Sequence, residues 1–349
     1  MRRGPVYILI CIVMIIAFVF TACGKSASGA DTTKLTTVKV AFDDAVTEAG
    51  VILADKLGYF EKQGIKMEYV RFNSGSDELS AIISNQVDVS RGIINAALFN
   101  ASSQGFNVKV VADGAYNIPG KGFFQIALKK GLGEKVKDFK DLKGLKIAIA
   151  SRGSINELFV EKALEKGGLS EKDISFVVVD SFPDMLTAVA NGNADATMQL
   201  EPLITKGVDE GILEWWKDPD TYATGEEMSV LMYSPNLVKK PELGKKFMVA
   251  YLKGVRAYCD ALVYGNKDQA KIVDILAKNT SVNDPATLLK MKTPGLEPNG
   301  KLLKEGIASD QQWYMNKGLV KSPADIGKLI DESYAKYAVG ILGEYKQPK

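Results

Sequence analysis

Short β-rich runs alternate with helical runs over residues 37–111. The expected strands are 38–42, 65–72 and 87–90, each rich in β-branched or aromatic residues. Between them, apolar residues recur every three to four positions over 46–60 and 77–85, which indicates helices with one buried face. Alternation of strands and helices predicts a mostly parallel sheet with helices on both of its faces.

A second set of alternating elements begins near Leu145. The expected strands are 146–150, 174–179 and 194–199. A helix is expected from Ser154 to the Gly167-Gly168 pair, and another over 183–190. This set predicts a second, smaller α/β lobe.

Two extended apolar runs, 123–128 and 228–233, separate these sets and are predicted to be hinge strands that carry the chain between the lobes. After Pro241 the pattern becomes helical, with long helices expected over 247–262 and 324–342. The expected fold class is therefore α/β, with two lobes joined by two hinge strands and a helical C-terminal segment. The predicted boundaries are residues 37–126 plus 230–349 for lobe 1 and 127–229 for lobe 2.

The N-terminal segment has the pattern of an export signal. Arg2 and Arg3 precede an apolar block that is shorter than the roughly 20 residues of a membrane-spanning helix, and Thr21-Ala22-Cys23 follows it. The junction resembles the bacterial lipobox, so residues 1–22 are predicted to be a lipoprotein signal peptide and Cys23 a lipidation site. Residues 23–36 are small and polar, which is typical of a flexible tether. An uncleaved anchor helix is the alternative.

Composition excludes several classes of function. The formal net charge of +2 equals the contribution of Arg2 and Arg3, so the remainder is neutral and nucleic acid is not an expected partner. The chain has no histidine, which removes Ser-His-Asp and Cys-His catalysis and histidine-ligated metals. Gly-rich phosphate loops and paired CxxC motifs are also missing, so neither a cofactor nor a metal is expected. Cys259 lies in an apolar helical run and is expected to be buried and unpaired.

Candidate ligand-binding residues follow from the fold. Ligands of open α/β sheets bind beyond the carboxyl ends of the strands, so the strand-to-helix loops of both lobes are expected to face a shared cleft. The candidates in or near these loops are Phe42, Asp43, Asp44, Ser74, Ser76, Asn95, Tyr116, Ser151, Arg152, Ser154, Phe182 and Glu201.

The sequence alone does not decide whether the ligand is an anion or a cation. Ser76 and Ser154 stand at helix starts, whose free amides favour an anion, and Arg152 could add a bidentate contact to a carboxylate or sulfonate. Asp43, Asp44 and Glu201 favour an amine, a hydroxyl or a ring nitrogen instead. Aromatic residues near the same loops would suit a flat ligand, or simply pack in the core; they are Phe42, Phe72, Tyr116, Phe123 and Phe182.

Several short motifs, in this order, resemble one transport family. They are Gly58-Tyr59-Phe60-Glu61-Lys62-Gln63-Gly64, Ser74-Gly75-Ser76, Val87-Asp88-Val89, the 141–148 run Asp-Leu-Lys-Gly-Leu-Lys-Ile-Ala, Gly153-Ser154, and Ala194-Asp195-Ala196 leading to Glu201-Pro202. Together they are similar to the solute-binding proteins of ABC importers of the nitrate, taurine and alkanesulfonate type (NitT/TauT, SsuA-like), which have a type II periplasmic-binding-protein fold. The resemblance covers about residues 38–320.

This resemblance implies an extracytoplasmic substrate-binding lipoprotein rather than an enzyme. A monomer, lipid-anchored at the outer face of the plasma membrane or in the periplasm, would capture a small polar solute, either sulfonate-, nitrate- or taurine-like or pyrimidine- or flavin-like. It would deliver that solute to a permease with a cytoplasmic ATPase. One alternative is a tethered receptor without transport. The other is an enzyme similar to fungal thiamine-pyrimidine synthases, which is disfavoured because those enzymes consume one of their own histidines.

Overall fold

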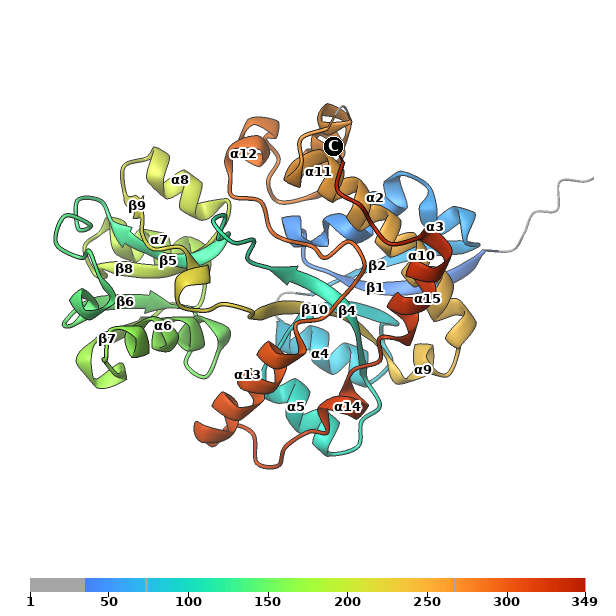
Figure 1. Cartoon of the computed structure of the whole chain (residues 1–349), viewed down its shortest axis with the longest axis horizontal. Helices are drawn as coiled ribbons and strands as arrows, with labels where there is room; N and C mark the ends of the chain where they lie inside the picture. Colours follow the sequence, from blue (N-terminus) through green and yellow to red (C-terminus); the bar gives the residue numbers. More distant parts are fainter. Residues whose placement is uncertain (1–34, 73–74, 267, 349) are drawn as a thin grey trace, which may run out of the picture. The chain divides into compact units, whose positions relative to one another are not determined.

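A computed structural model describes residues 35–72, 75–266 and 268–348, which contain two five-stranded sheets with helices (Figure 1). The predicted signal peptide, Cys23 and the tether up to residue 34 lie outside the described residues. No helix in the part of the chain described here has both the length and the apolar character needed to cross a membrane.

The first sheet has the strand order β2-β1-β3-β10-β4. β1 pairs in parallel with β2 and β3, whereas β10 is antiparallel to both β3 and β4. Its strands are β1 (Thr36–Phe42), β2 (Ile65–Arg71), β3 (Val89–Ile93), β4 (Lys109–Tyr116) and β10 (Glu227–Tyr233).

The second sheet repeats this arrangement with the order β7-β6-β8-β5-β9. β6 is parallel to β7 and β8, and β5 is antiparallel to β8 and β9. Its strands are β5 (Phe124–Lys129), β6 (Lys146–Ile149), β7 (Ser175–Val178), β8 (Ala196–Leu200) and β9 (Leu213–Trp215). Two mixed sheets of the same order confirm the predicted α/β fold class.

The two expected hinge strands are β5 and β10, and each is also the antiparallel strand of one sheet. After β4 the chain leaves the first sheet and enters the second as β5, and after β9 it returns as β10. In the second sheet β5 lies beside β8, and in the first β10 lies beside β4 (Figure 1). The chain crossings between the sheets are therefore the short segments before β5 and before β10.

Helices cover the sheets on both faces. Those between the strands of the first sheet are η1 (Val46–Glu48), α2 (Ala49–Lys56), α3 (Tyr59–Lys62), α4 (Gly75–Ile83) and α5 (Ala96–Ser103). Those of the second sheet are η2 (Phe139–Leu142), α6 (Ile155–Lys166), η3 (Glu171–Asp173), α7 (Phe182–Ala190), α8 (Leu203–Asp209) and η4 (Pro219–Thr221). The C-terminal ones are α9 (Pro235–Val238), α10 (Pro241–Tyr258), the π-helix η5 (Cys259–Val263), α11 (Gln269–Asn279), α12 (Pro285–Lys290), α13 (Lys304–Asn316), α14 (Ile326–Leu329) and α15 (Ser333–Leu342).

The alternation of side chains along β10 divides the core of the first sheet into two layers. Leu231 and Tyr233 pack in one buried cluster with residues of α2 and α10, and Val230 and Met232 pack in another with residues of α4, α5 and α13. The first of these clusters also contains buried residues of the second sheet and its helix α6, such as Ile147. The two sheets therefore share part of their hydrophobic core.

The turn around α3 depends on two glycines. Gly58 and Gly64 have φ angles of +72° and +74°, and a Cβ added at either would meet no atom within 4 Å. Backbone conformation alone therefore explains the glycines of the Gly-Tyr-Phe-x-x-x-Gly motif.

The prediction of one long helix over 324–342 is wrong. Helix α14 ends at Leu329, and Ile330 then forms a parallel bridge with Val110 of β4. The Asp331 amide donates to the Val110 carbonyl at 2.8 Å before α15 begins. Ile330 pairs with β4 at the edge of the first sheet, and this pairing separates α14 from α15. The apolar residues before and after Ile330 have helical spacing, which is why the sequence predicts one helix.

Candidate ligand-binding site

A cavity of about 260 Å³ lies between the two sheets and receives side chains from both. Its lining residues are Asp43, Ala45, Val46, Thr47, Phe72, Glu78, Arg91, Gly92, Ile93, Ala115, Phe123, Phe124, Ile155, Asn156, Phe182, Leu200, Glu201, Met228, Ser229 and Pro294.

The position of this cavity follows from the strand directions. Asp43, Phe72 and Glu201 come directly after the carboxyl ends of β1, β2 and β8. Phe124 and Met228 lie at the amino ends of the antiparallel strands β5 and β10, which meet the same edges of the sheets. The cavity is therefore where an open α/β sheet is expected to bind its ligand.

A buried arginine organises the wall formed by the first sheet. Arg91 of β3 is 8% exposed and donates from Nε to Glu48 Oε1 at 3.0 Å. Its Nη1 donates to Ser229 Oγ at 2.8 Å, and its Nη2 donates to Asp43 Oδ2 at 3.2 Å. These bonds join η1, β10 and the loop after β1 to the centre of the sheet.

Two carboxyl groups beside Arg91 have raised pKa values. Burial raises the pKa of Glu48 to about 8, against the opposing effect of Arg91. Burial and the nearby Asp43 raise the pKa of Glu78 to about 7, although Arg91 and a hydrogen bond from Ser90 Oγ lower it. This wall can therefore gain or lose protons near neutral pH.

The facing wall includes Glu201, whose carboxylate is held within the fold. Its Oε2 accepts from the Thr205 amide at 3.0 Å, and its Oε1 accepts from Thr205 Oγ1 at 2.9 Å and from the Lys292 amide at 2.8 Å. Burial raises the pKa of Glu201 despite these bonds. Because Lys292 precedes the cavity residue Pro294, Glu201 also fixes the segment after α12 against the second sheet.

Aromatic rings line both sides of the cavity. Phe72 follows β2, whereas Phe124 begins β5 and Phe182 begins α7. Phe124 and Phe182 pack edge to face with ring centroids 6.5 Å apart. Phe72 and Phe182 are half-buried, so parts of both rings remain accessible.

Three of the twelve candidate ligand-binding residues line this cavity: Asp43, Phe182 and Glu201. Phe42 and Asp44 line a separate hollow of about 270 Å³, where Asp44 pairs with Arg71. Asn95 caps α5 by accepting from the Leu98 amide, and Tyr116 ends β4 in a bridge with Gly295. Ser74 lies outside the described residues, and Ser76 is placed only as part of α4. A ligand-binding role for each of these residues stays a prediction.

The remaining candidates, Ser151, Arg152 and Ser154, also do not line the cavity. Ser154 precedes α6, but its Oγ donates to the Ser151 carbonyl, and the Gly153 amide donates to Glu157 Oε2. The Ser154 side chain therefore does not cap the first turn of α6.

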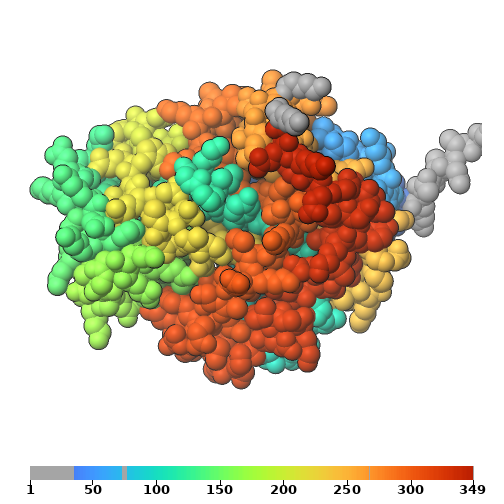
Figure 2. Space-filling view, in the orientation of Figure 1, coloured from blue at the N-terminus to red at the C-terminus, as the bar shows by residue number. Residues whose placement is uncertain are grey.

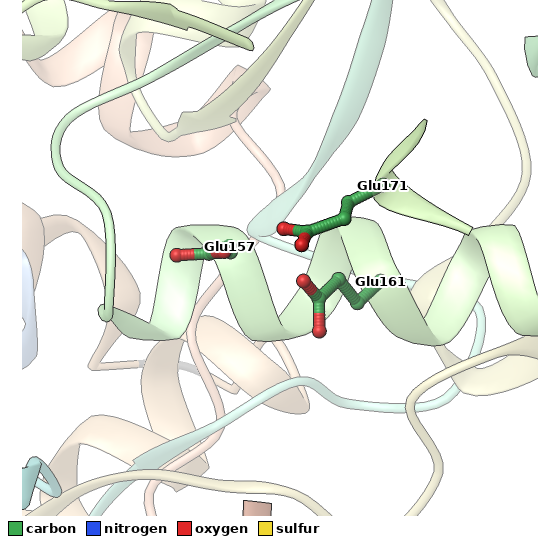
Figure 3. Close-up of side chains that lie close together, drawn as sticks. All are labelled: Glu157, Glu161 and Glu171. Atoms are coloured by element: carbon green, nitrogen blue, oxygen red, sulfur yellow. The ribbon is translucent and has the colours of Figure 1, made fainter. Parts of the chain in front are cut away.

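Arg152 belongs to a network of ion pairs. Its Nη2 pairs with Glu157 at 2.9 Å and with Glu171, and its guanidinium lies over the Phe176 ring. Lys317 Nζ donates to Glu157 at 3.1 Å, to Glu171 at 3.2 Å and to Glu161. Figure 3 shows Glu157 and Glu161 on α6 with the Glu171 side chain beside them. Two cations thus compensate three carboxylates whose oxygens lie within 4.8 Å of one another.

The Lys317 network connects the C-terminal segment to the second sheet. Trp313 of α13 also donates from Nε1 to Glu161 Oε2 at 2.8 Å. In Figure 2 the orange residues of this C-terminal segment lie against the green residues that surround the second sheet.

Sequence reasoning missed Arg91, Glu48, Asn156 and Ser229. The third strand was expected to end at Ser90, which left Arg91 in a loop instead of inside the sheet. The sequence did hold one signal for a buried arginine: Arg91 stands between the small residues Ser90 and Gly92, with apolar residues on either side of them. Ser229 could not be assigned in this way, because its contact with Arg91 joins residues 138 positions apart.

The arrangement of the sheets agrees with comparisons to known proteins. The sequence model of the NMT1/THI5-like family matches residues 46–261, more than half of the chain. The chain belongs to the NMT1/THI5-like family. The resemblance to solute-binding proteins that the motifs indicated is also confirmed, because the proteins similar to this chain include binding proteins of that type.

Over 349 residues the chain is 25% identical to a Bacillus subtilis (strain 168) protein named as a candidate aliphatic sulfonates-binding protein, with 97% of each covered. A solved ligand-binding component of an ABC-type import system from Staphylococcus aureus has a TM-score of 0.68 and 19% identity, covering 87% of this chain and 99% of that one.

An enzyme matches a smaller part of the chain. The 4-amino-5-hydroxymethyl-2-methylpyrimidine phosphate synthase of Schizosaccharomyces pombe is 27% identical over 152 residues, 43% of this chain and 40% of that protein. The match that spans nearly the full length is thus to a binding protein.

Proposed function

We propose that this protein is the extracytoplasmic solute-binding component of an ABC importer. It captures a small solute in the cavity between its sheets and delivers that solute to a membrane permease with a cytoplasmic ATPase. The cavity carries the proposal, because residues from the strand ends of both sheets line it, so one bound molecule would contact both halves. The full-length match to a binding protein gives further support.

In this proposal residues 37–126 with 230–349 form one lobe and residues 127–229 the other. The lobes separate to admit the solute and close around it, pivoting at the segments before β5 and before β10. The protein acts as a monomer, anchored to the membrane by a lipid on Cys23 outside the cytoplasm.

Binding without turnover is the expected activity. The chain has no histidine, so it lacks the residue that the thiamine-pyrimidine synthases resembling it consume. Of the acidic cavity residues, Glu201 accepts three hydrogen bonds from within the fold, and Asp43 accepts two, from Arg91 and from the Ala45 amide. We therefore assign these carboxylates to binding and positioning rather than to acid–base catalysis.

A ligand screen with a closure measurement tests the function. Thermal unfolding in the presence of sulfonates, nitrate, pyrimidines, flavins and amines should identify a ligand that raises the unfolding free energy by about 2.7 kcal/mol at a hundred times its dissociation constant. Small-angle X-ray scattering should then show a smaller radius of gyration with that ligand, and mass spectrometry should recover it unchanged. Stabilisation without compaction, or chemical conversion of the ligand, contradicts the proposal.

A further inference from the structure

The charges around the cavity are predominantly acidic. Among the described residues that line it, Asp43, Glu78 and Glu201 carry carboxyl groups, and Arg91 is the one cationic side chain. Glu48 adds a further buried carboxyl group behind this wall, in contact with Arg91. An anionic solute would therefore enter a site in which acids outnumber bases.

The hydrogen-bond donors of Arg91 are already used within the protein. Each of its three nitrogens donates to a protein acceptor, and two of those acceptors are the carboxyl groups of Glu48 and Asp43. A sulfonate or nitrate next to Arg91 would have to displace one of these acceptors, and the carboxylate of Asp43 would repel it.

The helix starts near the cavity also carry their own acids. Glu78 lies in the first turn of α4, and Glu157 lies in the first turn of α6, where its carboxylate accepts from the Gly153 amide. These carboxylates already occupy the favourable position at the positive end of each helix dipole. At the start of α6, the Glu157 carboxylate already holds an amide that a bound anion would use.

The apolar part of the cavity suits a flat ring. The accessible parts of Phe72 and Phe182 come from different halves of the molecule. Ile93, at the end of β3, is 46% exposed although it lines the cavity. An exposed aliphatic side chain in a cavity that aromatic rings also line is a surface that an aromatic ligand would cover.

We propose that the solute is a flat ring that bears a positively charged or hydrogen-bond-donating nitrogen, rather than a sulfonate or nitrate anion. The nitrogen is bound by Asp43 and Glu78, and the ring lies against Phe72 and Phe182. This inference rests on the proposed binding function and specifies its ligand class.

Binding of such a cation is coupled to a proton at Glu78. The charged and titratable groups facing Glu78 are Asp43, Glu48 and Arg91, and the pKa of Glu78 is about 7. A bound cation favours the carboxylate, so below this pKa binding must expel the Glu78 proton to solvent. The affinity for a permanently charged cation therefore rises between about pH 6 and pH 8.

Two ligands with the same ring and opposite charge test the proposal. Calorimetric titration of the full-length chain with benzamidinium should show binding, and benzenesulfonate should bind at least about tenfold more weakly. Glu78→Gln should weaken benzamidinium binding by about tenfold and remove most of its pH dependence. Glu61→Gln, at an exposed acid on α3, is the matched control and should change neither.

The outcomes separate the ligand class from the function. If benzenesulfonate, taurine or nitrate binds more tightly than benzamidinium and compacts the protein, the inferred ligand class is wrong and the binding function stands. If Glu78→Gln is folded, by circular dichroism, and binds benzamidinium like the native chain, the assigned contact is wrong. If no cationic, neutral or anionic solute binds at millimolar concentration, both proposals fail.

Discussion

At the scale of single residues, Arg91 can lie inside β3 because acceptors from three other segments surround it. A buried guanidinium is costly unless its N–H groups are hydrogen-bonded and its charge is balanced. Glu48, Ser229 and Asp43 supply these acceptors at 2.8–3.2 Å. The same contacts raise the pKa of Arg91 in spite of its burial, so it stays charged throughout the physiological range.

Replacing Arg91 should therefore be severe. Arg91→Met leaves the buried acceptors on Glu48 and Ser229 without their donor and should lower the free energy of unfolding by about 3–5 kcal/mol, measured by urea denaturation. Arg71→Met is the control: Arg71 pairs with Asp44, but its side chain is 68% exposed, so the loss should stay below about 1 kcal/mol. Equal losses for the two variants would refute this role of Arg91.

At the scale of elements, α2 and α10 cross at their glycines. A Cβ on Gly254 of α10 would lie 2.1 Å from the Gly50 carbonyl oxygen of α2, and one on Gly50 would lie 2.7 Å from the Tyr251 ring. Such distances are too short for any side chain. The close approach lets Tyr251 reach the Asp113 carbonyl on β4, to which its hydroxyl donates at 3.0 Å.

A pair of glycine substitutions measures this packing. Gly254→Ala should lower the free energy of unfolding by about 1–3 kcal/mol, because the helices must move apart. Gly340→Ala in α15 meets no atom within 4 Å and should raise it by about 0.5–1 kcal/mol through better helix propensity. Chemical denaturation of both variants gives the comparison. A stabilised Gly254→Ala protein would mean that the helices are not in contact at this position.

At the scale of the whole molecule, the C-terminal segment joins the two sheets away from the cavity residues. Tyr314 of α13 packs in the cluster beneath the first sheet, whereas Trp313 and Lys317 bond to Glu161 and its neighbours next to the second. Three carboxylates raise the pKa of Lys317 despite its partial burial. If one sheet moves relative to the other, either these bonds break or α13 and Lys317 move together with the second sheet.

Removing the Lys317 charge should ease that movement. Lys317→Met leaves Arg152 to balance Glu157 and Glu171 and leaves Glu161 without its cation, so the free energy of unfolding should fall by about 1–3 kcal/mol. The unliganded protein should also show a larger radius of gyration in small-angle scattering. Lys278→Met removes an exposed i,i+4 pair with Asp274 and should change neither quantity. An unchanged radius for Lys317→Met would show that the network does not restrain the sheets.

Prediction from the sequence succeeded where the spacing of apolar residues stays that of a strand or that of a helix over the whole element. The predicted strands 38–42 and 146–150 and the helix after Ser154 all appear in the structure close to their expected ends. It failed at 324–342, because a helical pattern cannot reveal that Ile330 pairs with a distant strand. For the cavity, strand ends correctly indicated its position and three of its lining residues, Asp43, Phe182 and Glu201.

Local patterns by themselves determined the two α/β sets, the absence of histidine chemistry and the edge of the sheets where a ligand is expected. These properties depend on side-chain periodicity and composition, which the chain carries in its order. Only the tertiary structure decided which charges meet. It placed Arg91 among Glu48, Asp43 and Ser229, and it placed Arg152 with Glu157, Glu171 and Lys317 instead of at the cavity. Charge balance depends on contacts between distant segments, and those arise only when the chain has folded.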